Sequence, residues 1–442
     1  MADKFDGAVL TQGDAGYEEA RRGHMWTARV PARYPDFVVQ AGSEQDVVNA
    51  VRMAKREGWR IAIRSGGHSW SANFLRDGGM LLDLGRMQEW SINIPAMTAW
   101  VRPGVIGSDL NRALMPHGLF FPTGHCMSVG LGGFLLQGGF GWNSRLWGPA
   151  CASVAAIDVV TAEGDLVRAD ATQNTELYWA ARGAGPGFFG AVTRFHLALR
   201  PRPKVMMNSI YHYPMSVMDE VYTWAAAIRP RLPRIMEPLV FMRRDLFDHP
   251  GPGLLVMGPT MADTREEAIA ALALLDSCPV LDQAIKRDVN IETELDELLA
   301  GGEETLYWKQ HRYAADNLWI NAQATELLPA MHRIAETLPG VPSHMMWILW
   351  GPEQELPDMA FSMQGDIYIA VYSVWNDPDQ DVQHQAWVTD NMRALEPLGK
   401  GIQLADENLA ARPFRFMSEA NLKRLEALRA KHDPSGLFHT YM

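Results

Sequence analysis

Two glycine-rich segments constrain this chain more than any other feature of its sequence. The first, Arg64-Ser65-Gly66-Gly67-His68-Ser69, follows an apolar run at 59–63 that predicts a short strand. The second begins at Gly124-His125-Cys126, and glycines follow at 130, 132, 133, 138, 139, 141 and 148. Glycine permits positive φ and lets backbone N–H groups approach a charged group closely. The two segments therefore predict a site for a phosphate-bearing cofactor.

The common nucleotide-binding motifs do not describe these segments. No Gly-Lys-Ser or Gly-Lys-Thr follows the glycines, and their spacing does not form a Gly-x-Gly-x-x-Gly fingerprint. Standing alone, Gly-Gly-His-Ser would be an ordinary surface turn. The preceding strand favours a ligand site instead, because open α/β layers bind ligands at the carboxyl ends of their strands.

Composition excludes several classes of protein. The 442 residues, 47% of them hydrophobic, suffice for two or three cores. Three cysteines, at 126, 151 and 278, are too few for a disulfide framework. A net charge of −12 argues against nucleic-acid partners, and no basic amphipathic stretch or apolar run indicates a membrane. Because residues 1–6 lack a basic and apolar leader pattern, we expect a cytoplasmic protein, and we predict no metal site.

The pattern of apolar residues predicts regular elements along the first 200 residues. A strand at 37–39, a helix from Ser43 to Gly58 and the strand at 59–63 form one predicted βαβ unit. A strand near 99–101 and a helix from Ser108 to Gly118 suggest a second such unit. Residues 155–169 predict a hairpin across Glu163-Gly164.

Arg200-Pro201-Arg202-Pro203 is stiff and polar, so a domain boundary is expected there. Beyond it, helices alternate with predicted strands near 206–213, 237–243, 252–258, 345–350 and 367–375. This rhythm favours an antiparallel or mixed sheet with helices on one face. An amphipathic helix is predicted at 418–431, before Asp433-Pro434.

Several motifs along nearly the whole chain carry a resemblance to one known family. They are 64–69, Gly124-x-Cys126-x-x-Val129-Gly130-x-Gly132-Gly133, Gly138-Gly139-x-Gly141, Arg145, Gly148, Trp179-Ala180-Ala181-Arg182-Gly183, Phe189-Gly190-x-Val192-Thr193, 421–425 and Asp433-Pro434-x-x-Leu437-Phe438. The chain resembles the berberine-bridge-enzyme-like branch of the flavin oxidoreductases with the p-cresol methylhydroxylase/vanillyl-alcohol oxidase fold. The resemblance implies an α+β chain with an FAD-binding domain of two subdomains at 1–203. It also implies a substrate domain at 204–403, with an antiparallel sheet covered by helices, and a return segment at 404–442 that packs on the FAD domain.

The resemblance also implies FAD as cofactor, bonded through His68 to the flavin 8α-methyl and through Cys126 to C6. A neutral imidazole and a thiolate are well suited to attack an electron-poor ring. The residues expected to bind FAD are Arg64, Ser65, Gly66, Gly67, His68, Ser69, Thr123, Gly124, Cys126, Val129, Gly130, Gly133, Gly139, Gly141, Val192 and Asn421. The implied reaction removes two electrons from a small molecule and passes them through the flavin to dioxygen, while a protein base accepts a proton.

The usual bases of the family are missing or moved in this sequence. Trp70 and Met417 stand where relatives often have tyrosine, and the strand near Ala370 lacks the Glu or Gln that is common there. Tyr372 shares a strand face with Ala370 and is our candidate proton acceptor. His125, beside the thiol, and His212, on the strand at 206–213, are the other candidates.

Methionine and tryptophan are abundant in the predicted substrate domain, which favours an aromatic or secondary-metabolite alcohol or amine as substrate. Three alternatives remain at this point. The chain could be a carbohydrate oxidase, a flavin dehydrogenase that uses another electron acceptor, or a flavin-binding protein without turnover.

Overall fold

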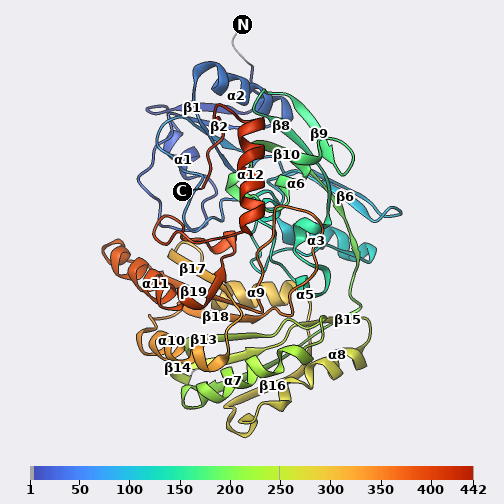
Figure 1. Cartoon of the computed structure of the whole chain (residues 1–442), viewed down its shortest axis with the longest axis vertical. Helices are drawn as coiled ribbons and strands as arrows, with labels where there is room; N and C mark the ends of the chain where they lie inside the picture. The colour runs from blue at the N-terminus through green and yellow to red at the C-terminus, as the bar shows by residue number, and fades with distance from the viewer. Residues whose placement is uncertain (1–3, 248, 442) are drawn as a thin grey trace.

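The fold comprises two halves that lie at opposite ends of the molecule (Figure 1). We analysed a computed structural model, which describes residues 4–247 and 249–441. Residues 1–3, part of the N-terminal stretch discussed above, lie outside the described residues. One half is built on two small sheets, and the other on one large sheet.

The first small sheet carries the first glycine-rich segment. Its strands are β1 (Ala8–Thr11), β2 (Phe37–Gln40), β4 (Met80–Asp83) and β3 (Ile61–Arg64), in that order, and β4 pairs in parallel with both β2 and β3. Helix α1 (Tyr17–Arg22) precedes β2, and α2 (Glu44–Glu57) follows it. The Ser43 side chain caps α2 by accepting the Asp46 N–H, and Gly58 ends it with φ 73°, which confirms the predicted helix.

The second sheet is antiparallel. Its order is β5 (Trp90–Asn93), β6 (Thr98–Val101), β10 (Gly190–Ala198), β8 (Val154–Thr161) and β9 (Leu166–Asp170). The β8–β9 pair confirms the predicted hairpin. The predicted second βαβ unit is wrong, because β6 pairs antiparallel with β5 and β10, while β7 (Leu119–Phe120) pairs with β11 (Arg200–Pro201). Pairing with a strand some ninety residues away leaves no local pattern. The helices of this region are α3 (Gly107–Leu114), α4 (Leu131–Leu136), α5 (Ser144–Trp147) and α6 (Thr175–Ala181).

The large sheet forms the other half, and all its described pairings are antiparallel. Its order is β15 (Thr260–Ala262), β12 (Val205–Pro214), β14 (His249–Met257), β13 (Leu239–Leu246), β18 (His344–Leu349), β19 (Ile367–Trp375), β17 (Arg312–Ile320) and β20 (Gly399–Gly401), with β16 (Lys286–Glu292) on β12. One face packs against α7 (Met218–Ile228), α8 (Arg265–Leu272), α10 (Ala324–Thr337) and α11 (Asp381–Leu395). This arrangement confirms the α+β class and the helix-covered antiparallel sheet.

The opposite face of the large sheet is turned toward the other half of the molecule. Phe241, Met346, Tyr368 and Tyr372 on this face share a core with Trp70, which follows the first glycine-rich segment. Helix α9 (Leu295–Thr305) lies between the halves (Figure 1). Contacts between aromatic side chains therefore join the sheet to the glycine-rich loops.

The end of the chain returns to the first half. Helix α12 (Glu419–His432) starts at the Ser418 cap and lies beside α6 and β10 (Figure 1). The Ile61 N–H then donates to the Leu437 carbonyl over 2.7 Å, so the last residues extend the first sheet. The domain limits at 203 and 403 stay predictions. None of the helices in the described residues is long and apolar enough to span a bilayer.

Candidate active site

A cavity of about 720 Å³ lies between the glycine-rich loops and the large sheet. This volume is typical of sites for cofactors and small molecules. Of the residues predicted to bind FAD, those that line it are Arg64, Ser65, Gly66, Gly67, His68, Ser69, Gly124, Cys126, Val129, Gly130, Gly133, Gly139 and Val192. The structure therefore brings the two segments together around one space.

Three predicted cofactor residues lie outside the lining and have structural partners. Thr123 accepts a hydrogen bond from the Asn111 amide over 2.9 Å. A Cβ atom at Gly141 would lie 2.3 Å from the Thr123 carbonyl oxygen, so this glycine serves close backbone packing. The Asn421 amide donates to the Met359 carbonyl over 2.9 Å and holds α12 against that loop.

The glycines of the two loops have different roles. A Cβ at Gly66 would lie 2.7 Å from the Gly130 nitrogen, so the loops touch backbone to backbone. Gly67 has φ +71°, and a Cβ there would lie 2.3 Å from the His24 carbonyl oxygen. At Gly133, by contrast, a Cβ would meet only the Ser65 hydroxyl, at 4.0 Å. This open stretch of backbone gives a flat or charged group room to lie close, and it fits FAD.

The two predicted attachment residues face this cavity, and burial keeps both of them uncharged. The His68 ring nitrogen Nε2 lies 2.9 Å from the Ser128 hydroxyl, and burial lowers the pKa of His68 to about 3, so the ring is neutral. Burial raises the pKa of the Cys126 thiol, and the charges of Asp406 and Glu303 act in the same direction. The expected thiolate is therefore disfavoured here, and Cys126 is a neutral thiol before any reaction.

Tyr372 lies on the cavity side of β19, as its shared face with Ala370 predicted. Its ring stacks on His344 with centroids 4.7 Å apart and meets Trp70 edge-on at 5.9 Å. Burial and the nearby charge of Asp406 raise the pKa of Tyr372 well above its ordinary value. Tyr372 is therefore a neutral hydroxyl that can donate or relay a proton.

The sequence did not single out Asp406, which lines the cavity just beyond β20. The Trp70 indole N–H donates to its Oδ1 atom over 2.7 Å, and the Tyr368 hydroxyl donates to Oδ2. The Tyr372 hydroxyl is also near this carboxylate. Desolvation raises the pKa of Asp406, although these donors partly oppose the shift. Its only sequence signal was polarity, in the run Asp406-Glu407-Asn408 of an otherwise apolar segment.

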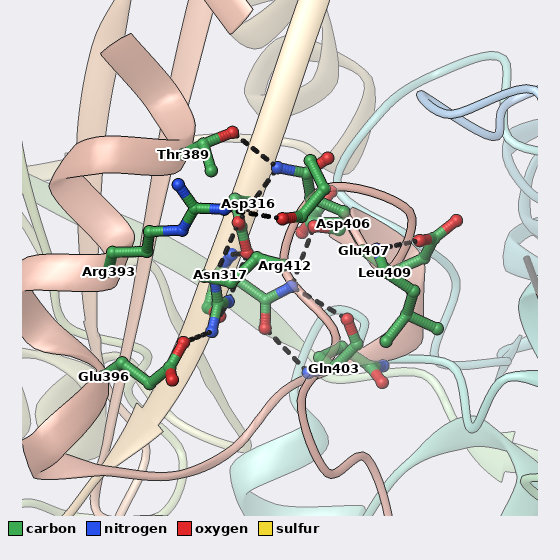
Figure 2. Close-up of polar contacts among 12 residues, drawn as sticks. Asp316, Asn317, Thr389, Arg393, Glu396, Gln403, Asp406, Glu407, Leu409 and Arg412 are labelled. Atoms are coloured by element: carbon green, nitrogen blue, oxygen red, sulfur yellow. Dashed lines mark hydrogen bonds and ion pairs between the residues drawn. The ribbon is translucent and has the colours of Figure 1, made fainter. Parts of the chain in front are cut away.

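The loop that bears Asp406 is fastened to strand β17 (Figure 2). The Asn317 amide donates to the carbonyls of Gln403 and Asp406 over 2.8 and 2.9 Å, and its oxygen accepts the Gln403 N–H at 2.7 Å. Arg412 forms a buried ion pair with Asp316 and donates to the Asn317 carbonyl over 2.8 Å. These contacts fix the backbone on both sides of the carboxylate, which is the condition for a precisely placed catalytic group.

The two histidine candidates lie in different surroundings. His125 lines the cavity, and the centroid of its ring lies 4.5 Å from that of Trp142. Its Nε2 atom forms a short contact with the buried carboxylate of Glu237. His212 is 1% exposed and lies outside the lining, with its ring against Phe247 and His249. Only His125, of these two, is placed to meet a molecule in the cavity.

Comparison with known proteins gives the family. Residues 35–170 match the FAD binding domain family. Over 433 residues the chain is 32% identical to the FAD-linked oxidoreductase penO of Penicillium crustosum, covering 97% of this chain and 94% of that protein. The chain belongs to the FAD-linked oxidoreductases. It is therefore an FAD-dependent enzyme, as the resemblance implied.

Solved structures agree with the expected fold of this FAD-linked oxidoreductase. 6-Hydroxy-D-nicotine oxidase from Arthrobacter nicotinovorans superposes with a TM-score of 0.86 at 22% identity, covering 99% of this chain and 97% of that one. BBE-like 1 of Physcomitrella patens gives a TM-score of 0.82 at 21% identity, covering 98% and 96%. These likenesses confirm the p-cresol methylhydroxylase/vanillyl-alcohol oxidase fold.

Proposed function

We propose that this FAD-linked oxidoreductase is an oxidase of a small-molecule alcohol or amine, and that Asp406 is its proton acceptor. The observation that carries the proposal is the Asp406 carboxylate, which faces the cavity between the glycine-rich loops and the large sheet. When bound, FAD would accept the C–H hydrogen of the substrate together with its electron pair, and dioxygen would then reoxidise the flavin and be released as hydrogen peroxide. The remaining O–H or N–H proton requires a base from the protein.

Asp406 has the properties that such a base needs. A raised pKa brings a carboxylate closer to the working pH, where a general base is most effective. Trp70 and Tyr368 hold both of its oxygens in place. Each donor contacts a different oxygen of the carboxylate. The carboxylate therefore cannot rotate without breaking both hydrogen bonds.

Tyr372 has a supporting role in this proposal. Its raised pKa makes the hydroxyl a poor acceptor on its own, but it can take the substrate proton as it gives its own proton to Asp406. His125, which contacts Glu237, is a further candidate proton acceptor in the cavity. Variants of Tyr372 and His125 therefore show whether the substrate proton reaches Asp406 directly, passes through Tyr372 or goes to His125.

We propose that FAD is bonded to His68 and to Cys126. Because Ser128 contacts Nε2 of His68, Nδ1 is the ring nitrogen left to form a bond. The neutral Cys126 thiol must lose its proton to react, and the Tyr307 side chain lies near it in the same buried cluster. Flavin should stay with acid-precipitated protein in each single variant, His68→Ala and Cys126→Ala, and be lost only in the double variant. Free flavin released by acid from the unmodified protein contradicts this attachment.

The cavity walls support an apolar or aromatic substrate body. Phe241, Leu255 and Met346 line the space from the large sheet, and Phe140 lines it from the second glycine-rich segment. Burial of such surfaces favours apolar ligands by about 25 cal/mol for each Å² removed from water. The proposal is tested by anaerobic mixing of the holoenzyme with a panel of aryl alcohols and amines. Bleaching of the flavin absorbance, followed by rapid recovery with hydrogen peroxide release on adding air, is expected. Slow recovery in air would instead indicate a dehydrogenase.

A further inference from the structure

The cavity contains one cationic group that the proposed reaction does not use. Arg243 on β13 is 9% exposed and lines the cavity. Its Nε atom is buried without a hydrogen-bond partner, and across residues 4–247 and 249–441 no carboxylate forms an ion pair with its guanidinium. A guanidinium removed from water is costly unless a partner compensates it. Arg243 is therefore a charge whose partner is missing from the described chain.

The groups around Arg243 do not neutralise it. Burial lowers the pKa of Arg243, and the charge of Asp245 only partly offsets this effect. Asp245 is exposed, and its Oδ1 accepts the Gly251 N–H over 2.8 Å in the hairpin turn. His344 pairs with Arg243 across the strands, but burial lowers the pKa of His344 to about 3, so it is neutral. Arg243 thus keeps its full charge toward the cavity.

Strand register places Arg243 relative to the proposed proton acceptor. His344 on β18 is directly opposite Tyr372 on β19 and directly opposite Arg243 on β13. The three residues form one row across the sheet, so Arg243 is two strand spacings, about 10 Å, from Tyr372. Phe241, on the same face of β13, makes the lining beside it apolar. A molecule that reaches from Asp406 to Arg243 crosses an apolar stretch and ends at a cation.

We propose that Arg243 binds a carboxylate at the end of the substrate opposite the oxidised alcohol or amine. The proposal rests on the proposed function, which places the reacting group at Asp406. A guanidinium pairs with one carboxylate through two parallel hydrogen bonds, which also orients the ligand. On the sheet side of the cavity, Arg243 is the one lysine or arginine among the described lining residues. A single guanidinium suits a carboxylate better than a phosphate dianion.

Binding to the holoenzyme tests this inference without turnover. The probes are benzoate, 3-phenylpropanoate and 5-phenylpentanoate, each with its primary amide, titrated against the holoenzyme and followed by calorimetry and by the visible flavin spectrum. We expect at least one acid to bind ten- to a hundredfold more tightly than its amide, because a hydrogen bond to a charged group contributes this much. The preference should disappear in Arg243→Gln while amide binding is unchanged.

Arg244→Gln is the matched control. Arg244 is the next residue, and its guanidinium donates to the Leu338 carbonyl, away from the cavity. This variant removes the same charge and should keep the preference for acids. Arg243→Met, which suits a buried position, replaces Arg243→Gln if the latter does not retain FAD.

Three results would overturn the inference. They are equal binding of every acid and its amide by the unmodified protein, a preference that survives loss of Arg243, and tighter binding of the matching phenylalkyl phosphonates than of the acids. Failure of the oxidation itself is a separate result, because the titrations need no reaction. An acid preference in a protein that oxidises nothing would reject the proposed function and leave the Arg243 site in place.

Discussion

The indole N–H of Trp70 donates to Oδ1 of Asp406 over 2.7 Å, although 336 residues separate the two in the chain. Trp70 directly follows the glycine-rich segment at 64–69, and Asp406 belongs to the segment that leads back from the large sheet. This hydrogen bond therefore ties the proposed proton acceptor to the cofactor side of the cavity. It also gives the Trp70 indole a polar role beside the cavity.

Replacing Asp406 with asparagine should slow flavin reduction by about two to four orders of magnitude, the usual contribution of a positioned general base. FAD content and the visible spectrum should stay intact, because asparagine keeps the size of the side chain and Asp406 is not among the residues expected to bind FAD. Anaerobic stopped-flow mixing measures the rate. Tyr372→Phe and His125→Gln are the comparisons, and a larger loss in either than in Asp406→Asn would transfer the role to that residue.

Trp70→Phe should shift the pH dependence of flavin reduction. Asp406 accepts a proton only when ionised, so the rate falls as the pH drops through its raised pKa. Loss of the indole donor destabilises the carboxylate and raises this pKa further, by roughly half to one unit for one hydrogen bond. The acid limb of the profile should therefore move to higher pH. An acid limb that stays in place would show that Asp406 does not control the rate.

Asn317→Leu should displace Asp406 without touching it. The change removes the three hydrogen bonds that hold the backbone of 403–406, at a cost to the free energy of unfolding of about 1–3 kcal/mol. Flavin reduction should slow at least about tenfold, because a misplaced base loses proximity. Asn321→Leu, the same change at an exposed position on the same chain segment, should leave the reduction rate unaltered.

Two glycine substitutions should separate folding from cofactor binding. Gly66→Ala places a methyl group 2.7 Å from the Gly130 nitrogen, so both the thermal stability of the flavin-free protein and its FAD content should fall. Gly133→Ala meets only the Ser65 hydroxyl at 4.0 Å. It should leave the melting temperature of the flavin-free protein nearly unchanged and lower FAD content alone. Equal effects of both substitutions on stability would contradict an open cradle at Gly133.

Asp406→Asn should also stabilise the fold at neutral pH. Because the folded pKa of Asp406 is raised, the folded state binds more protons than the unfolded state between the two pKa values, and stability falls as the pH rises through this window. Asparagine carries no charge and removes that penalty, which applies at pH values above the ordinary aspartate pKa of about 4. The melting temperature of the variant should exceed that of the unmodified protein at pH 7, and the gap should close on acidification.

The sequence predicted best what local patterns control. Ser43 and Gly58 marked both ends of α2, and the apolar runs located β12, β18 and β19 to within a few residues. The 59–63 strand begins two residues later, at Ile61, where pairing with β4 starts. Strand partners were harder to predict, because register between distant strands depends on packing that no short window contains.

In the candidate site, too, residues within a local motif could be predicted, whereas residues that depend on distant contacts could not. His68 and Cys126 drew attention because glycines surround both of them, and the family resemblance supplied their expected role as attachment residues. Asp406 could not, since its role depends on donors from Trp70 and Tyr368 that only folding brings near. Arg243 likewise gave no signal, because an arginine in a strand ordinarily faces solvent or an acidic partner.

The carboxylate of Asp406 is carried by a loop, whereas strands of the large sheet form the roof of the cavity. The proposed proton acceptor and the strand residues that line the cavity thus come from separate segments of the chain. Saturation libraries at Phe241, Met346 and Ile348 can reshape this wall of the cavity while the loop and its Asn317 anchor stay constant. Substitutions in these strands should therefore change which substrates bind while the proposed proton acceptor stays in place.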